Sequence, residues 1–112
     1  MTVTALALIP GATLGTSSAN LYASPTGTTS VVKRAVFTNT SGSAVTVSVN
    51  IVRSGGSSGT ANQLIDAQPI APGGTYVSPE LANMTLGPGD AIFANANAAS
   101  AVNLMVSGIQ IV

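Results

Sequence analysis

Gly and Pro recur along this chain at intervals of about 8 to 12 residues, which is too short a spacing for helices of ordinary length. The segments between them are rich in Val, Thr and Ile, which fit a pleated, half-buried sheet surface. Alternation is clearest in Ala44–Arg53, where every second residue from Val45 to Ile51 is Val or Ile. One face of that strand is expected in a core and the other in solvent. The chain is therefore predicted to be all-β.

Eight strands are predicted, and the last of them loses its alternation at Gly108, which indicates a β-bulge. A single sheet of eight strands would leave an apolar face in water. We therefore predict a two-layer antiparallel β-sandwich of jelly-roll or immunoglobulin-like topology. The 112 residues are expected to form one such domain, residues 1–112. The predicted strands are Val3–Ile9, Asn20–Ser24, Ser30–Thr38, Ala44–Arg53, Gln63–Ile65, Thr75–Ser78, Ala91–Ala96 and Val102–Val112.

The turns and the core follow from the same pattern. Thr40–Ser43 joins two strongly patterned strands and is predicted to be a hairpin loop. The Phe37-x-Asn39 pattern before it returns as Phe93-x-Asn95, which indicates either a second hairpin in the other sheet or chance convergence. A short helical turn fits Ala61–Pro72, the segment with the weakest pattern. The bulkier core residues are expected to be Phe37, Phe93, Leu21, Leu86 and Met105.

Only 5% of the residues are charged, and the six charges cancel. Without a basic stripe, nucleic-acid binding and attraction to anionic membranes are not expected. The chain has no His and no Cys, which excludes thiol nucleophiles and Ser-His triads. We expect no enzyme activity, no metal and no cofactor. The charged residues are Lys33, Arg34, Arg53, Asp66, Glu80 and Asp90.

Lys33 and Arg34 are candidate binding residues because they are adjacent within a predicted strand. Adjacent strand residues point to opposite faces, so one could face a subunit boundary or pair between the sheets with Glu80 or Asp90. The alternative is a pair of solvated charges at a strand end. Asp90 follows Pro88-Gly89 and is predicted to cap that turn rather than to bind a metal.

Tyr22 and Tyr76 are the other candidate binding residues, since aromatic rings can stack on sugars. With two tyrosines and no tryptophan, packing in the core or at an interface is the favoured interpretation. Two glycosylation sequons begin at Asn39 and Asn83. In a Ser- and Thr-rich chain with no visible signal peptide, both are interpreted as chance matches.

The composition of the surface favours a subunit of a large assembly. It is built from Ser, Thr, Asn and Gly, and it lacks the charge that keeps free proteins apart. It also lacks the Lys and Glu residues that usually protect edge strands from pairing. The N-terminal segment, residues 1–14, is predicted to be either an arm that pairs with a neighbouring subunit or an ordinary first strand.

Several motifs resemble small virion proteins of tailed bacteriophages. Asn20–Lys33 is similar to their L-Y-x-x-P-x-G-x-x-x-V-V-K opening, and Phe37–Ser41, Ile70–Thr75 and Leu86–Asp90 fit the same pattern. The resemblance implies a β-sandwich structural protein of the virion, assembled in the host cytoplasm, with no catalytic residues. Such proteins occur as capsid decoration (cement) proteins, head fibres and tail-fibre modules.

Within that class a decoration protein on the major capsid protein lattice is favoured, because the chain is short and has no fibrous repeat. The resemblance further implies a homo-oligomer, with a trimer favoured. The alternatives are a head-fibre or tail-fibre adaptor module and a carbohydrate-binding module for attachment to the host surface.

Overall fold

The computed structural model describes residues Met1–Val112 and contains nine strands, one short 3-10 helix and no α-helix. No helix in it is long and apolar enough to cross a membrane. The elements are β1 (Val3–Thr13), β2 (Ala19–Ala23), β3 (Thr29–Asn39), β4 (Val45–Val52), η1 (Thr60–Asn62), β5 (Gln63–Ile70), β6 (Thr75–Val77), β7 (Thr85–Leu86), β8 (Ala91–Ala96) and β9 (Val102–Ile111).

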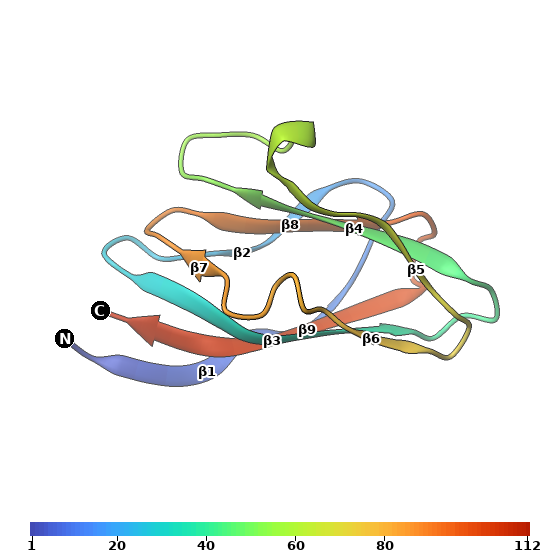
Figure 1. Cartoon of the computed structure of the whole chain (residues 1–112), viewed down its shortest axis with the longest axis horizontal. Helices are drawn as coiled ribbons and strands as arrows, with labels where there is room; N and C mark the ends of the chain where they lie inside the picture. Colours follow the sequence, from blue (N-terminus) through green and yellow to red (C-terminus); the bar gives the residue numbers. More distant parts are fainter.

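The strands form two antiparallel sheets that pack face to face (Figure 1). The first sheet has the order β1-β9-β3-β6, with β7 also paired to β3, and the second has the order β2-β8-β4-β5. The first half of the chain thus pairs with the second half, as β1 with β9, β2 with β8, β3 with β6 and β4 with β5. This is the pairing of a long hairpin rolled into a jelly roll. The predicted all-β sandwich is confirmed, and the strand order favours the jelly-roll alternative.

The core lies between the two sheets and consists mostly of Val, Leu and Ile. Inward-facing residues alternate along β4 and β9, so that Val47, Val49, Leu104 and Val106 are almost completely buried. Phe37 is fully buried among them. The expected core roles of Met105 and Phe93 are wrong, because the period of two that buries their neighbours in β9 and β8 turns both side chains away from the core.

Two strands run well beyond their predicted bounds, and a ninth strand, β7, was not predicted. β1 continues through Pro10 and Gly11 to Thr13, which is tolerated because β1 is an edge strand and a proline there need not donate to a neighbour. β5 extends to Ile70 despite Pro69 for the same reason. β7 has only two residues, too few to show alternation. Of the segment Ala61–Pro72, where a short helical turn was predicted, only Ala61 and Asn62 belong to the 3-10 helix η1, and the next eight residues form β5.

The hairpin predicted at Thr40–Ser43 is wrong. β3 belongs to the first sheet and β4 to the second, so this loop crosses between the layers. The connection from β8 to β9 crosses back in the same way, and Thr40 N–H donates to the carbonyl of Ala101 in that second loop. The repeated Phe-x-Asn pattern therefore precedes two connections between sheets rather than two hairpins.

Asn39 organises the first of these connections. Its side-chain amide donates to the carbonyls of Ser43 and Ile70, at 2.8 and 3.0 Å. Its side-chain oxygen accepts from the backbone N–H and the hydroxyl of Ser41. Asn39 is fully buried, so its side chain has no room for a glycan in the folded chain. The sequon at this position therefore agrees with the interpretation as a chance match.

The bulge predicted at Gly108 lies instead in the two strands beside it. Lys33 of β3 and Leu8 of β1 are each skipped in the pairing with β9, whereas β9 itself pairs without interruption. Gly108 keeps the phase of Val102–Val106 and faces inward. Ile109 and Ile111 consequently lie on the opposite, outer side of the first sheet.

Candidate functional site

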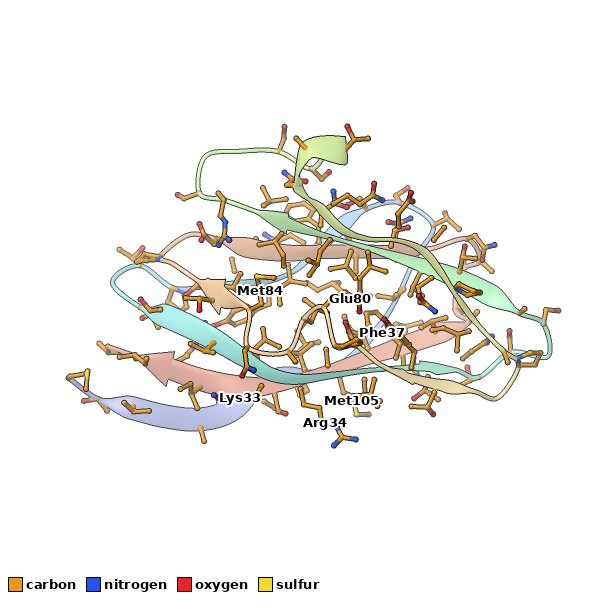
Figure 2. All side chains as sticks on the ribbon, in the orientation of Figure 1. Lys33, Arg34, Phe37, Glu80, Met84 and Met105 are labelled. Atoms are coloured by element: carbon orange, nitrogen blue, oxygen red, sulfur yellow. The ribbon has the colours of Figure 1, made fainter.

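Lys33 and Arg34 lie on the same side of the first sheet, which corrects the prediction that they point to opposite faces. The bulge at Lys33 inserts one residue into β3, so both side chains are exposed between the buried residues Val32 and Ala35. A bulge of this kind places two successive residues on one face. Figure 2 shows Arg34 and Met105 on the side of the sheet that points away from the second sheet.

The outer face is defined here as this side of the sheet formed by β1, β9, β3 and β6. Large apolar side chains are exposed on it, among them Val3 at 55% and Met105 at 57% exposure. Val77 of β6 is exposed beside Val36, its neighbour in β3. Sheet faces that meet water normally carry polar residues, so these exposed apolar side chains depart from the usual pattern.

A hollow of about 270 Å³ opens on the outer face, and it is called the outer hollow below. Met105 and Arg34 both line it, so a docking group would meet both a thioether and a guanidinium. Arg and Met are both enriched in protein interfaces. The outer hollow is lined by Ala7, Ile9, Pro10, Arg34, Val36, Met105, Val106 and Ser107.

The two cations of the outer face have no carboxylate partner. The single salt bridge of the structure joins Arg53 to Asp90, and Glu80 accepts hydrogen bonds from Tyr76 and Ser78. The predicted alternative of an inter-sheet pair from Lys33 or Arg34 to Glu80 or Asp90 is therefore wrong. The outer face carries two of the chain's three positive charges and presents them to solvent.

Asp90 caps a turn, as predicted. One carboxylate oxygen accepts from the backbone N–H of Gly87 at 2.9 Å and from Arg53 Nη1 at 2.8 Å, and the other accepts from the N–H of Ser54 at 2.9 Å. Burial alone would raise the pKa of this carboxyl. The hydrogen bonds from Arg53, Ser54 and Gly87 outweigh burial and lower the pKa of Asp90 below its ordinary value.

A second hollow, of about 350 Å³, lies beside β4 and β5. Its one cation, Arg53, already donates to Asp90 and to the carbonyl of Thr85. This hollow therefore offers a partner no cation that is free of hydrogen bonds within the chain. It is lined by Ile51, Arg53, Ala61, Asn62, Gln63, Leu64 and Met84.

The two tyrosines lie on opposite edges of the sandwich. Tyr22 is in β2, the edge strand of the second sheet that contacts β1. Tyr76 is in β6, the edge strand of the first sheet on the side away from β1. The Tyr22 hydroxyl is 2.7 Å from the Ser30 hydroxyl and accepts from Gln110 at 2.8 Å. It thus links strands of both sheets. Its half-buried ring and occupied hydroxyl are used for packing within the chain.

Tyr76 packs its ring against Phe37, with 6.1 Å between ring centroids. Its hydroxyl donates to the Glu80 carboxylate. Burial, and then this hydrogen bond and charge, raise the pKa of Tyr76 to about 12. The same hydrogen bond lowers the pKa of Glu80. The structure thus joins neither tyrosine to the outer hollow and does not bring the two together.

Replacing Glu80 with glutamine is expected to lower the pKa of Tyr76 only part of the way from about 12 toward 10.0. The carboxylate no longer opposes ionisation of the phenol, but burial of the ring, the largest cause, remains. Spectrophotometric titration of tyrosinate in a Tyr22→Phe background measures this group alone. An unchanged pKa would show that the charge of Glu80 has no effect on the phenol.

Sequence reasoning missed the apolar residues of the outer face. Their signal was present, because Met105 stands between Leu104 and Val106 at a position where an alternating strand carries a polar residue. Val36 has the same place in β3, between Ala35 and Phe37. Apolar residues at consecutive positions of a strand can mark a strand buried on both sides, and here they mark a sheet with an exposed apolar face.

Comparisons of the chain with protein-family models, with curated proteins and with solved structures find no match. The structure also contains no group of three or more acidic side chains that could hold a metal ion.

Proposed function

We propose that this chain is a non-enzymatic structural subunit of a tailed-bacteriophage virion, a decoration protein that binds the major capsid protein lattice through its outer face. The observation that carries the proposal is the outer hollow, an apolar depression beside two cations that have no partner in the chain. The sequence motifs between Asn20 and Asp90 resemble those of virion proteins, and this resemblance is the reason for proposing a phage virion as the assembly.

The chemistry of the outer face specifies the surface that it fits. Burying Met105 and Val36 favours an apolar knob on the partner, at roughly 25 cal/mol per Å² of apolar area removed from water. Arg34 and Lys33 require carboxylates near that knob, because a cation buried in an interface without a partner is strongly unfavourable. The proposed partner surface is therefore apolar with an acidic rim.

The jelly-roll topology is compatible with this role by analogy alone, since the same architecture serves both viral capsid domains and lectins. Glycan binding by stacking on the tyrosines would need exposed ring faces, but both rings are half-buried and Tyr76 packs on Phe37. The hydroxyls of Tyr22 and Tyr76 are instead engaged by Ser30, Gln110 and Glu80. The observed use of the tyrosines therefore supports an assembly role over glycan binding.

The proposal predicts that Arg34→Glu raises the dissociation constant for capsids by at least about tenfold, because it places a carboxylate against an acidic rim. Capsids prepared without the chain are titrated with the purified protein and sedimented. Wild-type protein should saturate at a fixed ratio to the major capsid protein, and added salt should weaken its binding. Asp66→Lys is the control for position, since it changes the charge by the same magnitude in the opposite direction on exposed β5 of the other sheet, and it should not weaken binding.

Failure of the folded wild-type chain to bind capsids would overturn the decoration role, and equal binding by Arg34→Glu would overturn the assignment of the outer face. Binding to purified tail fibres instead would indicate the adaptor alternative. Binding to host glycans that Tyr22→Ala or Tyr76→Ala abolishes would indicate a carbohydrate-binding module.

A further inference from the structure

β1 leaves a row of backbone groups without partners on its open side. Thr2 and Val112 exchange two hydrogen bonds of 2.9 Å at the end of the β1–β9 ladder. In an antiparallel ladder, hydrogen-bonded and non-hydrogen-bonded pairs alternate. The N–H and C=O groups of Val3, Ala5 and Ala7 therefore point away from β9, and none of the hydrogen bonds outside the ladders involves them.

The first half of β1 is also regular. From Val3 to Ala7 each residue pairs in turn with one residue of β9, and the first register shift comes only at Leu8. The segment contains no proline and no charged side chain, and its exposed residues are Val, Thr and Ala. A regular edge strand with free N–H and C=O groups can pair with a strand of another chain.

The other sheet edges are each interrupted. β6 has three residues, and β2 has five with a register shift after Asn20. β5 carries Asp66 and Pro69, and Ala67 has a φ of 51°. These are the features with which natural proteins prevent pairing at sheet edges. Only Val3–Ala7 lacks them.

We infer that Val3–Ala7 pairs antiparallel with the same segment of a second copy of this chain, about a two-fold axis at Ala5. Val3 then lies opposite Ala7 of the second copy, a larger side chain against a smaller one, and Ala5 lies opposite Ala5. All the free N–H and C=O groups of Val3, Ala5 and Ala7 find partners in this register. No like charges meet, because the segment has none.

A second copy fits this edge because its own Val3–Ala7 is equally open, regular and free of proline and charge, so one two-fold axis satisfies both rows of free backbone groups. The two-fold axis also stands perpendicular to the joined sheet, so the outer faces of both copies point to the same side. Ala7 belongs both to the paired segment and to the outer hollow, so the two hollows flank the junction. Where the proposed function holds, the dimer engages two lattice sites at once and gains avidity.

The test is the mass of the full chain in solution by light scattering at protein concentrations of about 100 µM. Wild type should have twice the mass of the 10.9 kDa chain. Ala5→Pro should shift it to the monomer and raise the dimer dissociation constant by at least about tenfold. Proline removes an N–H that faces the open edge and leaves the ladder to β9 intact. Thr75→Lys, on the exposed edge strand β6, is the control and should remain dimeric.

Amide hydrogen exchange gives an independent readout. The N–H groups of Val3, Ala5 and Ala7 should be protected in wild type and should exchange freely in Ala5→Lys, whose circular dichroism shows whether it is folded. A monomeric wild type, or an oligomer such as a trimer that Ala5→Pro and Ala5→Lys leave unchanged, would overturn the pairing.

The two proposals fail separately. A monomer that still saturates capsids would refute the edge pairing and leave the decoration role intact. A dimer that fails to bind capsids would refute the decoration role and leave the pairing intact.

Discussion

Replacing Gly108 with alanine is expected to lower the free energy of unfolding by about 3 kcal/mol, the upper end of the usual range for overpacking in a well-packed core. A Cβ at this position would lie 2.2 Å from the carbonyl oxygen of Val31 and 2.9 Å from Leu8 Cδ1. The Val31 oxygen is backbone of the central strand β3 and cannot move without shifting the ladder.

The position of Gly108 explains the size of the effect. β9 lies between β1 and β3, and both neighbours carry a bulge next to this residue. The bulges increase the local twist and bring a neighbouring backbone close to the Gly108 Cα, which only glycine permits. To relieve the clash, β9 would have to move away from β3, and the hydrogen bonds between these two strands would be lost.

Urea unfolding followed by circular dichroism measures this loss. Gly11→Ala is the matched control, since Gly11 also lies within a strand and an added Cβ would meet nothing within 4 Å. The control should change stability by well under 1 kcal/mol or raise it slightly, because alanine restricts the unfolded chain. Equal stability of the two variants would show that β9 can shift away from Val31.

Replacing Asp90 with alanine is expected to cost about 2 to 4 kcal/mol, because it leaves the N–H groups of Gly87 and Ser54 without acceptors. The ion pair itself contributes little to this cost, because the Arg53 side chain is 60% exposed and solvent screens its charge. The carboxylate joins the end of β4 to the turn before β8. The backbone carbonyl of Asp90 also accepts a hydrogen bond from the N–H of Ser24, which follows β2. Loss of the carboxylate should therefore loosen one whole end of the second sheet.

Thermal unfolding of Asp90→Ala measures this cost against Asp66→Ala. Asp66 is exposed, and its only side-chain hydrogen bond is one of 3.4 Å from Gln63, so its loss should change stability by less than about 0.5 kcal/mol. Equal melting temperatures for the two variants would contradict the structural role of Asp90.

The pH dependence of stability follows from the lowered pKa of Asp90. In the unfolded chain this carboxyl titrates at its ordinary value of 3.8, and in the folded chain it titrates lower. Its contribution to stability is therefore complete above the ordinary value and is lost as the pH falls through the folded pKa. Asp90→Asn should flatten this acid dependence. The dependence of the free energy of unfolding on acid pH that remains in this variant should come from Glu80, whose pKa is also lowered.

Much of the fold could be predicted from local sequence. Alternation in Ala44–Arg53 and in Val102–Val106 identifies strands because a period of two is a property of the strand itself. Pro88-Gly89-Asp90 predicts a capped turn, since its geometry involves only neighbouring residues. The surface poor in charge likewise indicated an assembly role before any strand order was known, and that role remains a proposal.

The remaining features depend on which strands become neighbours. The loop after Asn39 crosses between sheets because β3 pairs with β9 rather than with β4. The bulge at Lys33 turns Lys33 and Arg34 to one side, and it exists only relative to β9. Met105 is exposed for the same kind of reason, since the second sheet covers only one face of the first.

The sequence by itself determined the all-β character, the positions of most strands and turns and the scarcity of charge, because each is a property of residues adjacent in the chain. Only the tertiary structure decided the jelly-roll order, the outer hollow and the open edge of β1. Those features arise where segments distant in sequence meet or leave a side uncovered, and pairing over such distances is set by the packing of the whole sandwich.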